Sequence, residues 1–378
     1  MREERRLLIV VTHPMTADLL MRGQLRYLLE QGWRVGVVSS PGPQLDTVAA
    51  REGCTPFPVP MARAISPFAD LGALYRLARV VREFQPDVVS AGTPKAGLLG
   101  TLAAFLMRVP QRVYVLRGLR LETARGWRRR LLTMTERVAA RLATKVVCVS
   151  PSLRSRCLDL RLARAEKVTV LGSGSSNGVD TARFAPGDAP ASLVPFPPDI
   201  PVIGFVGRFT HDKGIADLLA AFARLRLEMP GLVLLLVGDH EEGDPVSPRV
   251  TRQLAECSEI HVIGFVQDTA PYYRRMSVLA FPSAREGLPN APLEAAASAV
   301  PTVAYRATGT IDAVVDGRTG AIVEQGDVEA LAEALLRYLE DPELAANHGR
   351  EARERVLEEF RSEIVWQRWA SFYASLLP

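Results

Sequence analysis

The sequence predicts an α/β protein built from two doubly wound domains, and three observations carry this prediction. Strand-like and helix-like segments alternate along the whole chain. The strand-like runs are continuous stretches of Val, Ile and Leu, as expected for parallel strands covered on both faces. The chain has 378 residues, which is too many for one ordinary core. A parallel sheet wrapped by helices in each half accounts for all three.

Six strands are expected in the first half of the chain, with helices between them. They span residues 7–12, 34–39, 86–90, 112–116, 145–149 and 168–171. The apolar run at 7–12 is too short for the central region of a signal peptide, so it is interpreted as the first strand. The longest apolar segment, residues 96–107, is far shorter than the roughly 20 residues of a membrane-spanning helix and is interpreted as a buried helix.

The second half repeats this scheme after a segment rich in Gly, Ser and Pro. Its expected strands span residues 202–206, 232–237, 260–263, 277–281, 301–305 and 320–323. Residues 172–180 are rich in Gly and Ser, and six prolines follow between positions 186 and 201. This composition is typical of a linker between domains, although a Gly-rich loop can also simply form a turn. The predicted domains are residues 1–175 and 201–361, joined by a linker over 176–200.

The last segment, residues 362–378, has an aromatic stripe at helical spacing. Its members are Trp366, Trp369, Phe372 and Tyr373. A helix packed into a core is the favoured interpretation, and a helix lying on a membrane surface is the alternative.

Composition describes an ordinary globular protein without an obvious metal or disulfide framework. The chain is 48% hydrophobic and 23% charged. Its four cysteines lack the C-x-x-C spacing of zinc sites, and a reducing, cytoplasmic setting is expected. The sequence contains no Asp-x-Asp and no cluster of His, Asp and Glu at ligand spacing, so no metal or other cofactor is expected.

Charge is divided unevenly between the two halves. Residues 1–185 hold 29 Lys and Arg against 14 Asp and Glu, a net charge of +15, and residues 186–378 hold 17 against 28, a net charge of −11. Six arginines lie within residues 117–130, interleaved with large apolar side chains. This basic first domain could contact an anionic membrane surface, a polyphosphate or an acidic carrier, or it could simply be solvated. Nucleic acid is not expected, because no stacking platform or recognition motif accompanies the arginines.

Two carboxylates flank a turn in the second half, Glu286-Gly-Leu-Pro-Asn-Ala-Pro-Leu-Glu294. The turn opens into a helix-like run, and a helix N-terminus offers free N–H groups to an anion. Pro289 has no N–H and can only shape the turn. Two acids on an exposed helix face are the alternative interpretation.

Two cations follow an expected strand about 80 residues upstream. The strand at 202–206 ends at Gly207, then come Arg208 and, before the next helix, Lys213. Ligands of open α/β sheets bind at the carboxyl ends of the strands, so these cations are placed to hold a diphosphate there. Two basic residues in a surface loop are the alternative.

Together these elements resemble the E-x7-E and G-R-x4-K-G signatures of retaining glycosyltransferases of the GT-B fold in the GT4 family. The resemblance implies two Rossmann-like domains facing across a cleft, with a C-terminal helix crossing back to the first domain. It implies that Arg208 and Lys213 stabilise the leaving phosphate, that Glu286 orients the donor sugar and that Glu294 holds the ribose. The donor-binding set so implied is Gly207, Arg208, Lys213, Gly264, Phe265, Val266, Glu286, Gly287, Leu288, Pro289, Asn290 and Glu294. Phe265 could equally belong to the core.

The first domain resembles the branch of that family found in bacterial surface-polysaccharide assembly. Carriers of this resemblance include Arg22-Gly-Gln-Leu-Arg-Tyr-Leu, Thr93-Pro-Lys-Ala-Gly and Arg117-Gly-Leu-Arg. Two departures stand out, since Arg117-Gly118 replaces a usual His-Gly and Ser90-Ala-Gly92 replaces a frequent His-x-His. The acceptor-side candidates are His13, Lys95, Arg117 and Arg120. A lone histidine such as His13 is also compatible with an ordinary hydrogen-bonded residue.

The function expected from this resemblance is metal-independent, retaining transfer of a sugar from a nucleotide donor, by family frequency a UDP-hexose or UDP-N-acetylhexosamine. The expected acceptor is a glycan or a lipid-linked sugar, commonly one on undecaprenyl diphosphate at the inner leaflet, and the expected location is the cytoplasm, including the inner face of the membrane. Three alternatives remain open: a soluble natural-product glycosyltransferase, a non-hydrolysing UDP-sugar epimerase and an inactive sugar-nucleotide-binding protein.

Overall fold

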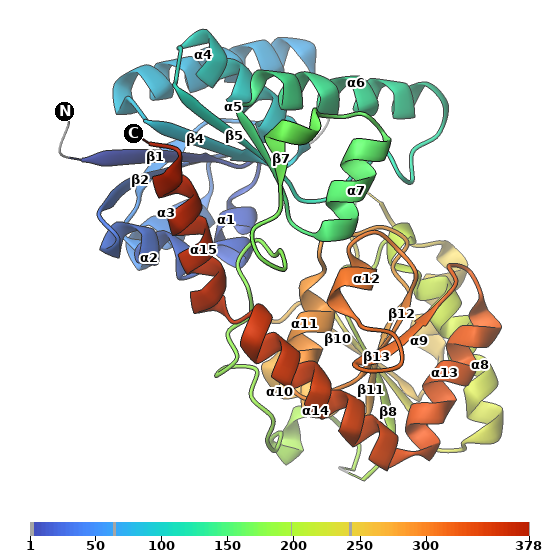
Figure 1. Ribbon diagram of the computed structural model, residues 1–378. Helices are drawn as coiled ribbons and strands as arrows, with labels where there is room; N and C mark the ends of the chain where they lie inside the picture. The colour runs from blue at the N-terminus through green and yellow to red at the C-terminus, as the bar shows by residue number, and fades with distance from the viewer. Residues whose placement is uncertain (1–3, 63–65, 198, 242–243, 378) are drawn as a thin grey trace. The chain divides into compact units, whose positions relative to one another are not determined.

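The computed structural model describes residues 4–62, 66–197, 199–241 and 244–377, arranged in two compact units (Figure 1). The N-terminal unit comprises Met1–Gly178 with Ser362–Pro378, and the C-terminal unit comprises Val179–Arg361. The predicted linker and terminal segment include Pro198 and Pro378, which lie outside the described residues. The domain boundaries expected at residues 175, 200 and 361 stay predictions.

The described part of the N-terminal unit holds a parallel sheet of seven strands in the order β3-β2-β1-β4-β5-β6-β7. Its strands are β1 Arg5–Val10, β2 Trp33–Ser39, β3 Thr55–Pro58, β4 Val88–Gly92, β5 Gln111–Leu116, β6 Lys145–Cys148 and β7 Val168–Thr169. The sequence patterns miss β3, whose Thr-Pro-Phe-Pro sequence carries two prolines. Proline is tolerated there because β3 is an edge strand, where one row of N–H groups is not needed for pairing.

Helices cover both faces of this sheet (Figure 1). They are α1 Pro14–Leu20, α2 Gln24–Glu30, α3 Pro43–Glu52, α4 Pro67–Phe84, α5 Pro94–Leu106, α6 Gly126–Leu142 and α7 Pro151–Asp159. A short 3-10 turn, η1 Ala165–Lys167, precedes β7. Helices α4, α5 and α6 pack side by side in one layer, and the apolar segment predicted as a buried helix is α5.

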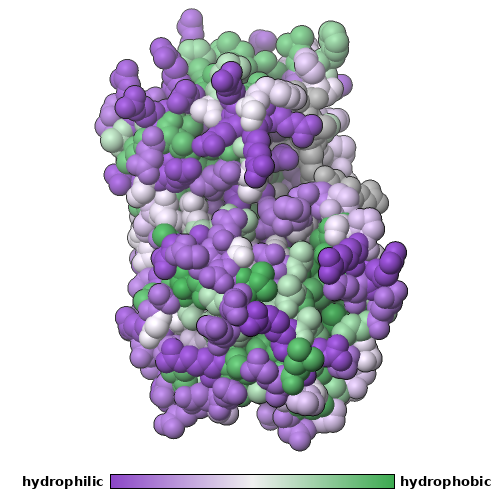
Figure 2. Space-filling model, turned by 90° about the vertical axis from the view of Figure 1, so that its right-hand side faces the viewer, coloured by the Kyte–Doolittle hydropathy of each residue, from purple (hydrophilic) through white to green (hydrophobic). Residues whose placement is uncertain are grey.

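The outer surface of the α4, α5 and α6 layer exposes large apolar side chains. Phe68 and Leu71 of α4 and Trp127 and Met134 of α6 are all more than half exposed. The guanidinium of Arg128 lies 5.8 Å from the centre of the Trp127 ring. In the upper part of Figure 2, hydrophobic residues stand among hydrophilic ones on the face shown.

The last helix, α15 Ser362–Ser375, belongs to the N-terminal unit although the chain before it belongs to the other. Its Trp369 and Tyr373 are buried, and the Tyr373 hydroxyl lies 2.8 Å from the Ser90 hydroxyl of β4. Trp366 donates its indole N–H to Asn177 Oδ1 at 2.7 Å. The aromatic stripe is therefore core, as the favoured interpretation of the sequence holds.

The described part of the C-terminal unit holds a parallel sheet of six strands in the order β10-β9-β8-β11-β12-β13. Its strands are β8 Val202–Val206, β9 Val233–Val237, β10 Ile260–Gly264, β11 Val278–Phe281, β12 Thr302–Tyr305 and β13 Gly320–Val323. Its helices are α8 Ile215–Glu228, α9 Pro248–Glu256, α10 Ala270–Tyr273, α11 Asn290–Ala297, α12 Thr310–Ala313, α13 Val328–Glu340 and α14 Pro342–Glu359. Two 3-10 turns, η2 Ala191–Leu193 and η3 His211–Lys213, complete the unit.

Successive residues of the central strands enter two different hydrophobic clusters. Val202 and Val206 of β8 belong to the cluster on one face, and Ile203 and Phe205 belong to the cluster on the other. Both faces of the sheet are therefore buried, which explains why the strands read as continuous apolar runs. None of the described helices combines the length and apolar character that a membrane span requires.

Each sheet reverses its strand order at one point, and this point places the candidate site. In the C-terminal unit the reversal falls between β8 and β11. In open α/β sheets, ligands bind at the carboxyl edge where the strand order reverses. The Gly207 to Lys213 loop follows β8 and the Glu286 turn follows β11, so the fold brings the two sequence motifs together.

Candidate functional site

The loops after β8 and β11 are tied by backbone and side-chain contacts. The Ala284 N–H donates to the Asp212 carbonyl at 2.8 Å, and Arg285 forms an ion pair with the Asp212 carboxylate. The pKa of Asp212 lies below its ordinary value. Burial acts to raise it, but the hydrogen bond from the Thr210 hydroxyl and the charges of Arg285 and Lys213 lower it by more. Asp212 is thus a fixed anion that holds η3 against the Glu286 turn.

Gly214 is required where η3 meets α8. Its φ of +69° lies in the left-handed region, and a Cβ added there would lie 2.1 Å from the Pro282 carbonyl oxygen. No side chain fits between these two loops. The glycine of the Lys-Gly pair therefore permits the close approach that the site depends on.

Lys213 and Glu286 meet at this sheet edge as a largely buried ion pair. Their side chains are 16% and 13% exposed. The Ser283 hydroxyl donates to the same Glu286 oxygen, Oε1, at 2.6 Å, and the Lys213 ammonium lies 5.7 Å from the centre of the Phe281 ring. The structure thus brings together two of the three predicted catalytic residues and adds Ser283, which sequence reasoning missed.

Arg208 lies at the same sheet edge but has a different partner. Its guanidinium donates to Glu241 Oε2 at 2.6 Å and is 63% exposed. Glu241 follows β9, the neighbour of β8. The structure therefore joins Lys213 to Glu286 and Arg208 to Glu241, instead of placing both cations on one anion.

Helix α11 presents an uncapped N-terminus beside Glu286. Pro289 stands at the N-cap position without a side-chain cap, and the helix starts at Asn290. The first N–H groups of a helix lack intrahelical acceptors, so those of Asn290 and Ala291 can receive an oxyanion. The backbone of Gly309 lies directly against this turn, since a Cβ at that position would lie 2.2 Å from the Gly287 carbonyl oxygen.

Glu294 lies one turn further along α11 and is bound to Tyr273. The Tyr273 hydroxyl donates to Glu294 Oε2 at 2.9 Å. Burial raises the pKa of Glu294, although the tyrosine hydrogen bond and the charge of Arg183 act in the opposite direction. A carboxyl group in this setting is suited to hydrogen bonding with a hydroxyl such as that of a ribose.

Three glycines line the carboxyl ends of neighbouring strands next to the site. Gly207, Gly238 and Gly264 follow or end β8, β9 and β10, and the Gly238 N–H donates to the Gly264 carbonyl at 3.0 Å. Phe265 is 61% exposed and Val266 packs partly on the core. The alternative that Phe265 is a core residue is therefore wrong, because its ring faces outward at this edge.

The acceptor-side candidates lie in the N-terminal unit, His13 after β1, Lys95 in the first turn of α5, and Arg117 and Arg120 in the loop after β5. His13 caps α1, its Nδ1 accepting from the Met15 N–H at 3.3 Å. Lys95 forms an ion pair of 2.6 Å with Asp70. Arg120 is exposed, and Arg117 directly follows β5.

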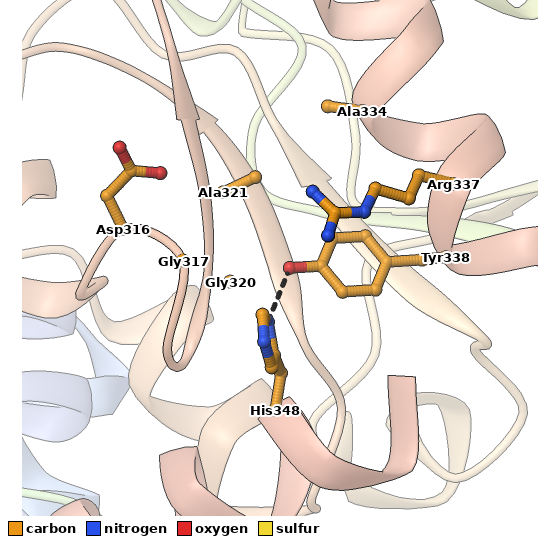
Figure 3. Close-up of a pocket in the computed structure, with 8 residues that line it drawn as sticks. All are labelled: Asp316, Gly317, Gly320, Ala321, Ala334, Arg337, Tyr338 and His348. Carbon is orange, nitrogen blue, oxygen red and sulfur yellow. Dashed lines mark hydrogen bonds between the residues drawn. The ribbon is translucent and has the colours of Figure 1, made fainter. Parts of the chain in front are cut away.

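A small pocket of about 140 Å³ lies elsewhere in the C-terminal unit (Figure 3). Residues at the start of β13 and just before it form one side of the pocket, and Tyr338 and His348 form another, with the Tyr338 oxygen 2.8 Å from His348 Nδ1. Because Gly317 and Gly320 stand at the start of β13, the pocket is at the amino edge of the sheet. It is separate from the Lys213 and Glu286 site at the opposite edge.

No described residues form a group of three or more His, Cys, Asp or Glu side chains that could hold a metal ion. The polar groups at the carboxyl edge are three ion pairs, Lys213 with Glu286, Arg208 with Glu241 and Arg285 with Asp212, and a helix N-terminus. This arrangement suits an anionic ligand that also carries hydroxyl groups.

The site residues missed from the sequence are of two kinds. Asp212, Ser283 and Arg285 stand within a few residues of predicted positions, and their place in loops after strands was a usable signal. Glu241 and Tyr273 pair with residues 33 and 21 positions away. No local pattern marks such partners.

Comparisons with known proteins agree with this architecture. Residues 200–341 match the family described as glycosyl transferases group 1, and residues 20–174 match the glycosyl transferase 4-like domain. The capsular polysaccharide biosynthesis glycosyltransferase CapM of Staphylococcus aureus is 37% identical over 95% of this chain and 94% of its own length. The UDP-Gal:alpha-D-GlcNAc-diphosphoundecaprenol alpha-1,3-galactosyltransferase of Escherichia coli is 26% identical over 74% of this chain and 73% of its own length.

Among solved structures, sucrose-phosphate synthase from Thermosynechococcus elongatus superposes with a TM-score of 0.81 at 21% identity, covering 98% of this chain and 99% of that one. The fold is therefore that of GT-B glycosyltransferases, two parallel-sheet α/β domains in one chain. With CapM matched along nearly its whole length, the chain belongs to the GT4-like, group 1 family of glycosyltransferases.

Proposed function

We propose that the chain moves a sugar from a UDP-sugar, a UDP-hexose or UDP-N-acetylhexosamine, to a hydroxyl of a polyprenyl-diphosphate-linked sugar in surface-polysaccharide assembly. The observation that carries the donor half is the Lys213 and Glu286 pair beside the uncapped N-terminus of α11. The acceptor half draws its support from the relatives, one a capsular enzyme and one named for a diphosphoundecaprenol acceptor.

In the proposed reaction the C-terminal unit stabilises the leaving diphosphate. Negative charge grows on the phosphate oxygen as the anomeric bond breaks, and in this proposal Lys213, Arg208 and the N–H groups of Asn290 and Ala291 stabilise it. Lys213 is already held by Glu286, so little reorganisation is needed when the charge develops. Glu286 accepts hydrogen bonds from the sugar hydroxyls while it keeps Lys213 in position.

We further propose that transfer retains the anomeric configuration and requires no metal ion. In this proposal the acceptor attacks the face from which the diphosphate departs, and the departing phosphate oxygen takes the proton of the acceptor hydroxyl. Glu294 holds the ribose hydroxyls, and the exposed Phe265 with its neighbours Gly264 and Val266 meets the base.

We also propose that the chain acts at the cytoplasmic face of a membrane, which it contacts through its N-terminal unit. The support is the exposed apolar surface of α4 and α6, including Phe68 and Trp127, together with the arginines of α6. Apolar side chains and cations on one helical surface favour an anionic bilayer, each cation contributing on the order of 1 kcal/mol.

The donor is tested by thermal unfolding of the full chain with UDP-, GDP-, ADP- and dTDP-sugars. A ligand at 100 times its dissociation constant stabilises the folded state by about 2.7 kcal/mol. A rise in melting temperature with UDP-sugars alone is expected. Stabilisation by another nucleotide only, or by none, would contradict the proposed donor.

A further inference from the structure

The N-terminal sheet also has one point where its strand order reverses. That point lies between β1 and β4, and β5 is the next strand beyond β4. Thr12, Thr93 and Arg117 each follow one of these three neighbouring strands. Their side chains therefore start from adjacent positions along the carboxyl edge, where open α/β sheets bind ligands.

The guanidinium of Arg117 is largely enclosed by the described residues. Its Nε and Nη1 atoms are enclosed and have no hydrogen-bond partner among the described residues, while the residue as a whole stays partly exposed. Burial lowers the pKa of Arg117 to about 10, so the guanidinium keeps its charge at neutral pH. Enclosed, unpaired N–H groups cost folding free energy, which a bound oxyanion would recover.

Gly92, at the end of β4, leaves space for the guanidinium of Arg117. A Cβ at Gly92 would lie 3.0 Å from Arg117 Nε and 3.5 Å from Cζ. The φ of Gly92 is not positive, so its backbone conformation does not require glycine. The missing side chain matters because it leaves space for the guanidinium. Arg117 and Gly92 are also the positions where this chain departs from the expected histidines, and the small residue makes room for the large cation.

Thr93 supplies a second and independent feature of this edge. Its φ of +74° is unusual for a β-branched residue, and such strain tends to occur at functional sites. The Thr93 hydroxyl lies 2.7 Å from that of Thr12. Thr93 is the N-cap of the 13-residue helix α5 but makes no side-chain cap, so the first N–H groups of α5 lack that partner.

We propose that Arg117 and the N-terminus of α5 bind the diphosphate of a lipid-linked acceptor. This inference rests on the proposed function, since it concerns the acceptor of that reaction. A carboxylate has two oxygens, which can accept hydrogen bonds from the guanidinium but leave none for the helix N–H groups. A diphosphate has enough oxygens to accept from both. Two donors of different kinds at one edge therefore favour the phosphate.

The test is calorimetric titration of the full chain with geranyl diphosphate, in the presence of saturating UDP so that the nucleotide site is occupied. Geraniol and sodium glucuronate serve as comparison ligands for the lipid alone and for a carboxylate. The variants are Arg117→Gln, Arg117→Lys and Gly92→Ala, and the control is Arg164→Gln, which removes an arginine whose side chain is 83% exposed.

Wild type is expected to bind geranyl diphosphate at least about 10-fold more tightly than geraniol or glucuronate, and Arg117→Gln to weaken this binding by about 10- to 100-fold. Arg117→Lys should fall between the two, because it keeps the charge but not the planar fork. Gly92→Ala should weaken binding with the charge intact, because its Cβ displaces the guanidinium. Arg164→Gln should match wild type within about twofold.

The proposal fails if wild type does not bind geranyl diphosphate, if Arg117→Gln binds it as tightly as wild type, or if Arg117 matters only for glucuronate. Separate UDP titrations distinguish this failure from failure of the proposed function. Wild type that binds UDP but not geranyl diphosphate overturns the acceptor inference alone. Wild type that binds geranyl diphosphate through Arg117 but no nucleotide overturns the proposed donor alone.

Discussion

At the scale of single residues, the candidate site is a set of charges that balance one another before any ligand arrives. Lys213 pairs with Glu286, Arg208 with Glu241, and Arg285 with Asp212. The exposed Arg208 pair should be weak, because water screens it. The buried Lys213 pair is fixed more firmly, since its ammonium has little access to solvent. An incoming diphosphate can therefore engage Arg208 readily and must share Lys213 with Glu286.

Replacing either cation by alanine should slow sugar transfer by about 100-fold or more, the scale of losing one oxyanion stabiliser. The prediction concerns Lys213→Ala and Arg208→Ala, measured as turnover with saturating donor. Arg224→Ala is a matched control, because Arg224 forms an exposed pair with Glu329 in the same unit. Near-normal turnover in both site variants would refute their assigned role.

At the scale of elements, the close approach of η3 to the β11 loop depends on Gly214. A Cβ at this position meets the Pro282 carbonyl, whereas one at Gly326, also at positive φ, meets nothing within 4 Å. Gly326→Ala should therefore cost only the roughly 1–2 kcal/mol of a left-handed side chain. Gly214→Ala should cost more and also lower turnover, because it separates Lys213 from Glu286. Equal stability and equal activity of the two variants would contradict this account.

A second element-scale prediction concerns pH and the packing of α6 on β5. The Tyr114 hydroxyl donates to Glu136 Oε2 at 2.5 Å, and burial raises the pKa of Glu136 to about 7 against the effect of that hydrogen bond. Between the ordinary value of 4.5 and about 7, the folded state binds more protons than the unfolded chain. The free energy of unfolding should therefore fall as pH rises through this interval.

Urea unfolding at pH 5 and pH 8 measures this effect. The wild type should lose on the order of 1–3 kcal/mol more than Glu136→Gln between the two pH values, because the variant has no carboxyl to titrate. An identical pH dependence for both proteins would show that Glu136 does not titrate in this interval.

The strands and helices could be predicted well from the sequence where the hydrophobic pattern is strong. Buried strands such as β8 and β9 read as continuous apolar runs because both faces are covered. Strand β3 could not be recognised, since its two prolines are acceptable only at an edge that the sequence does not reveal.

The candidate site shows the same division. The positions of Lys213 and Glu286 follow from motifs beside strands, and the family resemblance that they carried is confirmed by the match to CapM. Their direct pairing, and the partnership of Arg208 with Glu241, depend on tertiary geometry across loops of different strands. Arg117 stood out as a departure from the resemblance, but only the structure shows that Gly92 accommodates it.

At the scale of the whole molecule, two α/β units of opposite charge are joined in one glycosyltransferase chain. The basic first half and the acidic second half, at +15 and −11, suit different partners. In the proposed function, the C-terminal unit binds the donor through its ion pairs and a helix N-terminus. In the same proposal, the N-terminal unit binds an anionic acceptor and contacts a membrane through its apolar, arginine-rich surface.

We propose that the C-terminal unit binds the diphosphate of the donor at Lys213 and the start of α11. A crystal structure of the full chain with UDP tests this most directly. Phosphate oxygens are expected within hydrogen-bond distance of Lys213 Nζ and of the Asn290 or Ala291 N–H, with the ribose at Glu294. A diphosphate bound away from the carboxyl edge of β8 and β11 would contradict it.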